Sequence, residues 1–347
     1  MKVAITGSSG LIGTAVAASL RGDGHQVLRL ARRPARPRAS AGTGTDAGTG
    51  TNAGTGTNAG TGADAHRAAA GDDAVSGWDP DSVDGGLDPH AFTDVTAVVH
   101  LAGPGIADRR WTAARKAEIR NSRVRGTRAL ATGLARLDKP PATLLSGSAI
   151  GWYGNTGVHE TDESGPPGTG FLADLVRDWE QAADPARAAG IRTAHLRSGL
   201  VLASGGGTLG RLVPIFKLGF GIPLGSGRQY MSWISLADEV GAVRFLLDRP
   251  DLAGPVNLTA PHPVTNSEFT AALNVALGEP TVLRLPVPGF RLPGSLLHVP
   301  TPALDLALGE VSGELLASAR VLPRRLLDAG YGFQHPDLAS TLAAVLT

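Results

Sequence analysis

The chain has 347 residues, no cysteine and a formal net charge of +1, from 32 lysines and arginines against 31 aspartates and glutamates. The lack of cysteine excludes disulfides, thiolate catalysis, iron–sulfur clusters and cysteine-ligated zinc, and the balanced charge argues against nucleic-acid and basic membrane-binding surfaces. No stretch of about twenty apolar residues occurs and the apolar N-terminal run is too short for a signal peptide, so we expect a cytoplasmic protein without a membrane partner.

The chain opens with a short apolar strand at residues 2–5, a glycine-rich turn and a helical stretch at residues 14–21. The turn has glycines three residues apart, as dinucleotide-binding turns do, where they permit the tight turn, the approach of a pyrophosphate and close packing of helix on strand. The start of the helix offers unpaired N–H groups to phosphates. The residues predicted to bind a dinucleotide here are Thr6, Gly7, Gly10, Leu11, Ile12 and Gly13. The alternative is a structural βα turn that happens to be rich in glycine.

The second strand, residues 26–30, is followed by Ala31, Arg32, Arg33 and Pro34, with no acidic residue in reach. A site selective for NAD usually has Asp or Glu at this point to bind the ribose 2′-hydroxyl. Arginine suits a 2′-phosphate instead, because the guanidinium pairs with it bidentately. We therefore predict that the cofactor is NADP(H), held by Arg32 and Arg33. A solvated basic loop end is the alternative.

A low-complexity segment follows the second strand. Between residues 42 and 65 a six-residue unit, GTGTDA in its first copy, occurs four times. The unit has no large apolar side chain, so it cannot offset its ordering entropy by burial. We expect residues 36–76 to form a disordered insertion in a surface loop, with no role in catalysis.

Strand and helix patterns alternate after the insertion. Strands are predicted at residues 97–101, 142–146 and 192–197, and helices at residues 111–137 and 172–189. Such alternation indicates an α/β fold with a doubly wound parallel sheet, that is, a Rossmann-like domain.

The pattern loosens after Ser198 into segments rich in glycine and proline. The length allows one large α/β domain with a smaller appendage. We expect residues 1–240 to form the NADP-binding domain and residues 241–347 a smaller C-terminal lobe with a helical tail. Parts of residues 199–235 are expected to contribute to the substrate cleft.

Several motifs occur in the order expected for one enzyme family. They are TGSSGLIG at 6–13, HLAG at 100–103, NSRVRGT at 121–127, RSGLVL at 197–202 and WISLAD at 233–238. With these motifs the chain resembles an extended short-chain dehydrogenase/reductase over most of its length outside the repeat. SAIGWYG at 148–154, WE at 179–180 and NLTAP at 257–261 are similar to the atypical subgroup of "epimerase family proteins", which are NAD-dependent epimerase/dehydratase-like. Residues 308–331 resemble the C-terminal domain of unknown function of that subgroup.

The resemblance implies further contacts with the cofactor. The implied residues are Leu101, Ala102, Gly103, Glu118, Arg123 and Leu200. Glu118 and Arg123 match subgroup positions that approach the cofactor, and Leu200 should pass near the nicotinamide. A solvated helix face is the alternative for the first two, and a structural turn for the third.

The usual chemistry of the family needs a tyrosine as acid/base and a lysine four residues later. The corresponding positions here are Phe171 and Leu175, which neither exchange a proton nor carry a charge. Ser146 and Ser148 end the fourth predicted parallel strand at the carboxyl edge of the sheet, where doubly wound folds bind ligands. We expect Ser146 to contact the cofactor and take Ser148 and Tyr153 as catalytic candidates. A packing or nicotinamide-facing role is the alternative for Tyr153.

The nine histidines show no metal-ligand spacing, so no metal site is expected. The leading interpretation is an NADP(H)-dependent oxidoreductase or epimerase-like enzyme that acts on an unknown small molecule without the standard pair. The alternatives are a non-catalytic NADP-binding sensor or regulatory module, and a scaffold with a vestigial pocket. A helix-pair homodimer is common in the broader family, and the sequence leaves this state open.

Overall fold

The fold is built on a seven-stranded parallel sheet with the strand order β10-β6-β5-β4-β1-β2-β3. The computed structural model describes all residues except 33–72, 107, 280–281, 285–290, 294–297 and 347. The strands are β1 Lys2–Thr6, β2 Gln26–Arg32, β3 Ala74–Trp78, β4 Val95–His100, β5 Thr143–Ala149, β6 Arg192–Ser198 and β10 Gly254–Leu258. The order changes direction between β1 and β4, which makes this the switch point where doubly wound sheets bind ligands. The predicted Rossmann-like fold is confirmed.

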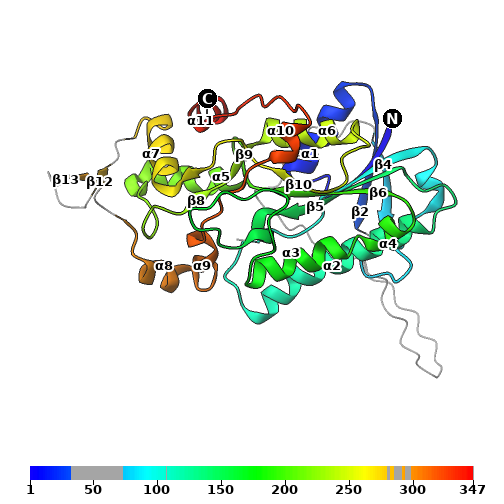
Figure 1. Cartoon of the computed structure of the whole chain (residues 1–347), viewed down its shortest axis with the longest axis horizontal. Helices are drawn as coiled ribbons and strands as arrows, with labels where there is room; N and C mark the ends of the chain where they lie inside the picture. The colour runs from blue at the N-terminus through cyan, green and yellow to red at the C-terminus, as the bar shows by residue number, and fades with distance from the viewer. Residues whose placement is uncertain (33–72, 107, 280–281, 285–290, 294–297, 347) are drawn as a thin grey trace, which may run out of the picture.

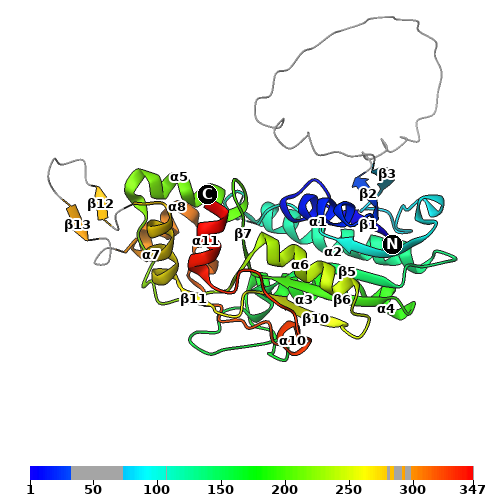
Figure 2. The same cartoon turned by 90° about the horizontal axis from the view of Figure 1, so that it is seen from above.

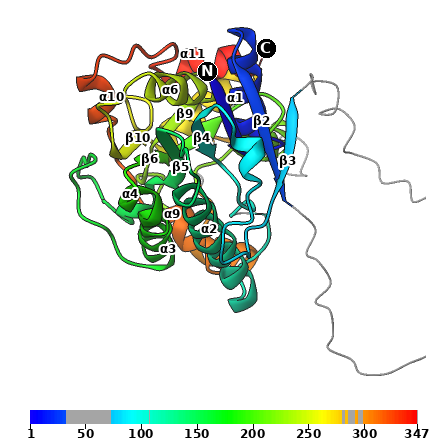
Figure 3. The ribbon, with the colours of Figure 1, turned by 90° about the vertical axis from the view of Figure 1, so that its right-hand side faces the viewer.

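Helices cover both faces of this sheet (Figures 1 and 3). On one face lie α1 Leu11–Gly22 and α6 Leu236–Leu247, and on the other lie α2 Ala113–Ala135, α3 Phe171–Gln181 and α4 Asp184–Ala188. Each helix layer buries its own apolar cluster against the strands. The central strands are buried on both faces, which explains why their sequences are continuous apolar runs rather than alternating ones.

The edge strand β3 lies partly inside the segment that the sequence assigned to the insertion. The insertion was expected to reach residue 76, but Ala74–Trp78 pairs with β2 and buries Trp78, whose ring meets the His100 ring edge-on at 5.7 Å. The strand is only five residues long and includes Ser76 and Gly77, so its pattern does not stand out beside the repeat. Residues 36–72 of the expected insertion lie outside the described residues.

A smaller lobe lies at the carboxyl ends of the strands, since β6 continues directly into the first strand of the lobe (Figure 2). Its strands form the pairs β7 Leu200–Leu202 with β9 Trp233–Ser235, β8 Tyr230–Met231 with β11 Val264–Thr265, and β12 Val282–Arg284 with β13 Arg291–Pro293. Its helices are α5 Gly207–Ile215, continued by the π-helical turn Phe216–Phe220, α7 Asn266–Ala276, α8 Thr301–Leu308, α9 Val311–Leu316 and α11 Leu338–Leu346. The parallel sheet takes β10 from beyond residue 240, so it does not end at the expected domain boundary.

The C-terminal segment runs back from the lobe to the edge of the large sheet. Thr161 forms a parallel bridge with Val321, and the Ser232 hydroxyl donates to the Ala319 carbonyl and accepts from the Val321 N–H. Beyond it, α10 Arg324–Asp328 packs against β10. In the part of the chain that the structure describes, no helix combines the length and the apolar character needed to span a membrane.

Candidate cofactor and active site

The first βα turn depends on its glycines. Gly7 has φ +67°, and a Cβ there would lie 2.6 Å from the carbonyl oxygen of Leu101. A Cβ on Gly13 would collide with the Gly7 carbonyl. Gly10 is the N-cap of α1 and no side chain caps that helix, so its first N–H groups face the turn without side-chain partners. The geometry is that of a turn that can hold an anionic group at a helix N-terminus.

A cavity of about 620 Å³ lies over this turn. It is lined by Gly7, Ser8, Ser9, Gly10, Arg29, Leu30, Ala31, Arg32, Val75, Trp78, Leu101, Ala102 and Gly103. Arg29 donates from Nε to the Ser8 hydroxyl at 3.2 Å, and Arg32 is exposed at the end of β2. The described residues that line the cavity include two arginines and no carboxylate. Arg33, predicted beside Arg32, lies outside the described residues.

The structure brings six of the predicted cofactor residues together around this cavity. They are Gly7, Gly10, Arg32, Leu101, Ala102 and Gly103. Ser8 and Ser9 of the glycine-rich turn also line the cavity. The lining residues that the sequence did not assign to the cofactor are Arg29, Leu30, Ala31, Val75 and Trp78. A cation in the middle of an apolar strand was the available signal for Arg29, while Val75 and Trp78 belong to the strand that was not predicted.

Thr6 does not line the cavity but fixes one of its walls. Its hydroxyl accepts hydrogen bonds from the N–H groups of Leu101, at 3.1 Å, and Ala102, at 3.3 Å. The same hydroxyl is hydrogen-bonded to Nδ1 of His100, whose Nε2 contacts Thr127 at 3.0 Å. Burial lowers the pKa of His100 to about 4, so the ring is neutral at physiological pH. Its two hydrogen bonds connect β4 to β1 and to α2.

The other predicted residues of α1 lie behind the turn or beside it. Gly13 and Ile12 pack toward the core, and Leu11 reaches the loop at the start of α5. A Cβ on Gly206 or Gly207 would lie within 3.3 Å of the Leu11 methyl groups. This glycine-rich loop therefore packs closely on the end of the first βα turn.

Four more predicted cofactor residues lie outside the lining of the cavity. Arg123 is buried directly behind Gly103, where a Cβ would lie 3.4 Å from its guanidinium carbon. Glu118 is exposed and pairs with Arg115 at 2.8 Å. Ser146 was expected to end its strand, but β5 continues to Ala149, so Ser146 is fully buried in the middle of the strand. Leu200 is half-buried beside Trp233 at the start of β7.

The two catalytic candidates belong to one buried polar network. Ser148 donates to Oε1 of Glu180 at 2.7 Å, and Glu180 accepts two further hydrogen bonds from Arg197, at 2.7 and 2.9 Å. Arg197 also donates to the Tyr153 hydroxyl at 3.0 Å, and Tyr153 donates to Oδ1 of Asn257 at 2.8 Å. The network connects β5, α3, β6 and β10.

Burial raises the pKa of Tyr153 to about 12, against the opposing effect of Arg197. The Arg197 guanidinium also stacks on Trp152, with its carbon 4.0 Å from the ring centroid. Tyr153 and Ser148 are both buried and do not line the cavity over the first turn. The phenol therefore keeps its proton at neutral pH, and both hydroxyls already have protein partners.

The C-terminal segment completes this network. Asn257 donates from Nδ2 to the Leu322 carbonyl at 2.9 Å, and its N–H donates to Glu163 at 2.9 Å. Desolvation is the main cause that raises the pKa of Glu163. Sequence reasoning singled out neither Glu163 nor the role of Asn257, because these contacts join residues far apart in the chain.

The start of α3 holds an aromatic side chain where the family's tyrosine is expected. Phe171 packs edge-on against Trp111, with ring centroids 4.9 Å apart. Leu175, at the lysine position, is buried in the cluster around Trp111 and Val311. These side chains make an apolar contact between the sheet domain and the C-terminal lobe.

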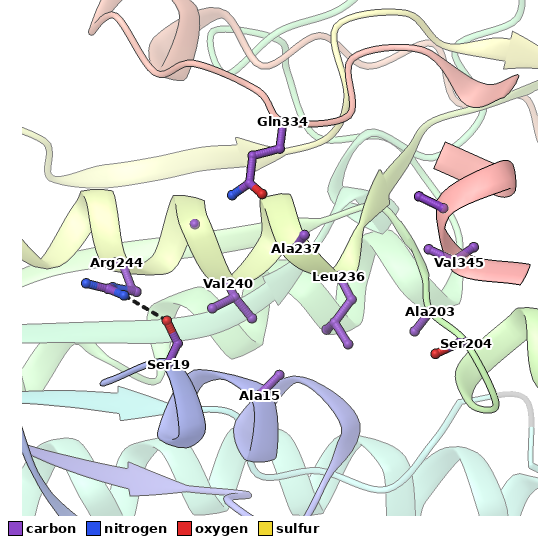
Figure 4. A pocket seen from close by; sticks show the side chains of 12 residues that line it. Ala15, Ser19, Ala203, Ser204, Leu236, Ala237, Val240, Arg244, Gln334 and Val345 are labelled. Carbon is purple, nitrogen blue, oxygen red and sulfur yellow. Dashed lines mark hydrogen bonds between the residues drawn. The ribbon is translucent and has the colours of Figure 1, made fainter. Parts of the chain in front are cut away.

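A second cavity, of about 600 Å³, lies between α1 and α6, in the helix layer that these two form on one face of the sheet (Figure 4). Its lining comes from α1, α6, the loop after β7 and the C-terminal residues, and most of it is small or apolar. Arg244 donates to Ser19 at 2.8 Å and pairs with Asp23. Its charge is thus met by a carboxylate, whereas the partner that the structure gives Arg29 is the neutral Ser8 hydroxyl. Among the described residues, no group of three or more His, Cys, Asp or Glu is placed to hold a metal ion.

Comparison with known proteins agrees with this geometry. The sequence profile "NAD dependent epimerase/dehydratase family" matches residues 3–258, and the profile "Domain of unknown function (DUF1731)" matches residues 299–345. An epimerase family protein of Mycobacterium tuberculosis is 43% identical over 347 residues, covering 99% of this chain and 97% of that protein. Epimerase family protein SDR39U1 of Bos taurus is 32% identical over 353 residues, with full coverage of both chains.

A solved structure extends the comparison. The crystal structure of human epimerase family protein SDR39U1 (isoform 2), described with NADPH, matches 99% of both chains at a TM-score of 0.76 and 28% identity. The resemblance found in the motifs is confirmed, including the C-terminal domain. The chain belongs to the NAD dependent epimerase/dehydratase family and, within it, is similar along its whole length to the atypical members called epimerase family proteins.

Proposed function

We propose that this protein binds NADP(H) over the first βα turn and transfers hydride between it and an unidentified small molecule. The support is the cavity at the switch point of the sheet, together with the NADPH described for the human relative. The bound cofactor would supply the hydride. The chain would supply orientation: Gly7 and Gly10 allow close approach of the diphosphate, and Thr6 holds the opposite wall at Leu101 and Ala102.

The observation that carries the choice of cofactor is a pair of arginines on β2, Arg29 in the middle of the strand and Arg32 at its end. Arg29 and Arg32 both line the cavity, and no carboxylate does so among the described residues. A carboxylate there would bind the 2′-hydroxyl of NAD and repel a 2′-phosphate. Guanidinium groups favour the phosphate instead, through charge-assisted hydrogen bonds.

Charge reversal at Arg32 tests this choice. We expect Arg32→Glu to weaken NADPH binding by roughly 10- to 100-fold and to leave NADH binding within about threefold, because charged hydrogen bonds contribute about 1.5–3 kcal/mol. The readout is the fluorescence of each reduced dinucleotide on titration. Arg128→Glu, an exposed reversal on α2 away from the cavity, should change neither affinity. Equal losses for both dinucleotides in Arg32→Glu would place the 2′-phosphate elsewhere.

A non-catalytic NADP-binding sensor is the second candidate. It is favoured by the missing Tyr/Lys pair and by the fact that the hydroxyls of Ser148 and Tyr153 are engaged inside the protein. Screening carbonyl compounds for NADPH oxidation separates the two. An enzyme turns over at least one compound class, whereas a sensor binds NADPH with no turnover.

Tyr153→Phe tests the proton donor once a substrate is in hand. If Tyr153 donates the proton, turnover falls at least roughly 100-fold while NADPH affinity is unchanged. The variant also leaves a buried donor of Arg197 and the Asn257 carbonyl unsatisfied, which costs about 1–3 kcal/mol of stability. The turnover of Tyr153→Phe is therefore measured beside that of Ser148→Ala, at a temperature where both variants are folded. Unchanged turnover in Tyr153→Phe removes it as the donor.

A further inference from the structure

Two arginines of α2 lie buried behind the segment that follows β4. Arg115 is 8% exposed and Arg123 is 7% exposed. In the described part of the chain, Nε of each is buried without a hydrogen-bond partner. Burial, together with the neighbouring charge of Arg115, lowers the pKa of Arg123 to about 10. The positive charges of Arg115 and Arg123 therefore lie near each other and are largely shielded from water.

Arg123 has no ion pair with a carboxylate among the described residues. It donates to the carbonyl oxygens of Pro104, at 3.0 Å, and Ile119, at 3.5 Å, and its guanidinium carbon lies 5.1 Å from the centroid of the Trp179 ring. Neutral carbonyls and a ring face compensate a buried charge only in part.

Arg115 has carboxylate neighbours, but they are exposed to solvent. Its contacts are Glu118 at 2.8 Å and Asp108 at 3.7 Å, whose side chains are 57% and 42% exposed. Asp108 is shared with Arg211. Arg115 donates its shortest hydrogen bond, 2.6 Å, to the Gly105 carbonyl. Asp108 thus serves two guanidiniums, and Arg115 has no carboxylate partner that is withdrawn from solvent.

The position of the pair connects it to the cofactor cavity. Gly103 lines that cavity, and its lack of a side chain leaves only backbone between the cavity and Arg123. From there the segment runs past Gly105 toward the lobe, where Arg110 donates to the Leu306 carbonyl and Lys116 pairs with Glu310. Gly103 and Gly105 are both exposed. Both glycines therefore expose backbone rather than side chain along the segment that runs from the cavity toward the lobe.

We propose that Arg115 and Arg123 recognise an anionic group of the substrate, and that the substrate is a small molecule with a carboxylate or phosphate. The proposal rests on the proposed function, since it places the anion beside bound NADP(H). The planar guanidinium suits either oxyanion, because both accept two parallel N–H donors. The carbonyls of Pro104 and Gly105 occupy these donors when no anion is bound.

The test uses the full-length protein with oxalate and inorganic phosphate as probes. Thermal midpoints are measured with and without saturating NADPH, at ionic strength kept constant with potassium chloride. Each probe is expected to raise the thermal midpoint of the wild type by about 2 °C or more above the midpoint in potassium chloride of the same ionic strength. The same rise is expected when NADPH is present at saturation. Arg123→Met and Arg115→Met should lose at least half of that shift. Arg125→Met, an exposed substitution on the same helix, should keep it.

Three outcomes would overturn the proposal. One is an equal anion shift in Arg123→Met and the wild type. Another is a wild-type shift that disappears when NADPH saturates, because the anion then occupies the cofactor's own phosphate site. The third is no shift beyond chloride in the wild type, which decides the matter even where the arginine variants fail to fold. NADPH fluorescence is followed in the same samples, so loss of dinucleotide binding, which would refute the proposed function, is seen separately.

Discussion

Replacing Gly10 by glutamate is expected to abolish measurable NADPH binding, a loss of at least roughly 100-fold, while the protein stays folded. The new carboxylate would face the diphosphate across the cavity, and like charges in such proximity cost several kcal/mol. The fold tolerates the change because Gly10 is exposed, has φ −82° and would place a Cβ no closer than 3.3 Å to the Gly7 carbonyl. A carboxylate in the first turn of a helix is itself mildly stabilising, by about 0.3–1 kcal/mol. In Gly10→Glu the affinity for NADPH should therefore fall while the free energy of unfolding stays the same or rises slightly.

Two variants control for size and for charge elsewhere. Gly10→Ala adds the Cβ without the charge and should retain most of the affinity. Gly22→Glu puts the same residue at the far end of α1, where a Cβ meets nothing within 4 Å, and should leave affinity unchanged. Fluorescence titration with NADPH measures all three. Full affinity in Gly10→Glu would mean that the dinucleotide does not lie over this turn.

The largest effect on stability is expected from Arg197→Met. Arg197 and Glu180 have side chains only 3% and 9% exposed, so removal of the guanidinium leaves a buried carboxylate without its counter-charge. Breaking such a pair on one side costs about 3–5 kcal/mol. The Tyr153 hydroxyl loses a donor as well. Urea denaturation should show a much lower midpoint with an unchanged slope.

The double variant Arg197→Met with Glu180→Leu separates the pair from simple packing. It removes both charges and should recover most of the lost stability, since apolar replacements of buried ion pairs are often close to neutral. Arg187→Met, which breaks the exposed pair with Asp184, should cost less than about 1 kcal/mol. A midpoint for Arg197→Met near that of Arg187→Met would contradict the buried-pair account.

The sheet and the first βα turn could be predicted because both depend on local sequence. Apolar runs over β1 and β4 identify buried parallel strands, and the glycine spacing from Gly7 to Gly13 follows from backbone contacts within one turn. The helix predicted at 172–189 is two helices in the structure, α3 and α4. Periodicity alone does not reveal that break.

The rest depended on contacts between distant residues. Arg29 is recognisable as a cavity residue only when β2 is placed beside the first turn, and β3 only when it pairs with β2. The partners of Ser148 and Tyr153 come from 32 and 104 positions further along the chain. A sequence reading finds the hydroxyls at the edge of the sheet but not the carboxylate and amide that engage them.

The parallel bridge between Thr161 and Val321 bears on how this molecule is made. Chains fold progressively from the N-terminus as they leave the ribosome. The Leu322 carbonyl accepts a hydrogen bond from Asn257, and the Val321 N–H donates one to Ser232, so these groups are synthesised 65 and 89 residues after their partners. Nascent chains therefore hold the finished first βα turn next to an incomplete sheet edge, and the polar interior at that edge closes only after residues 321 and 322 have left the ribosome.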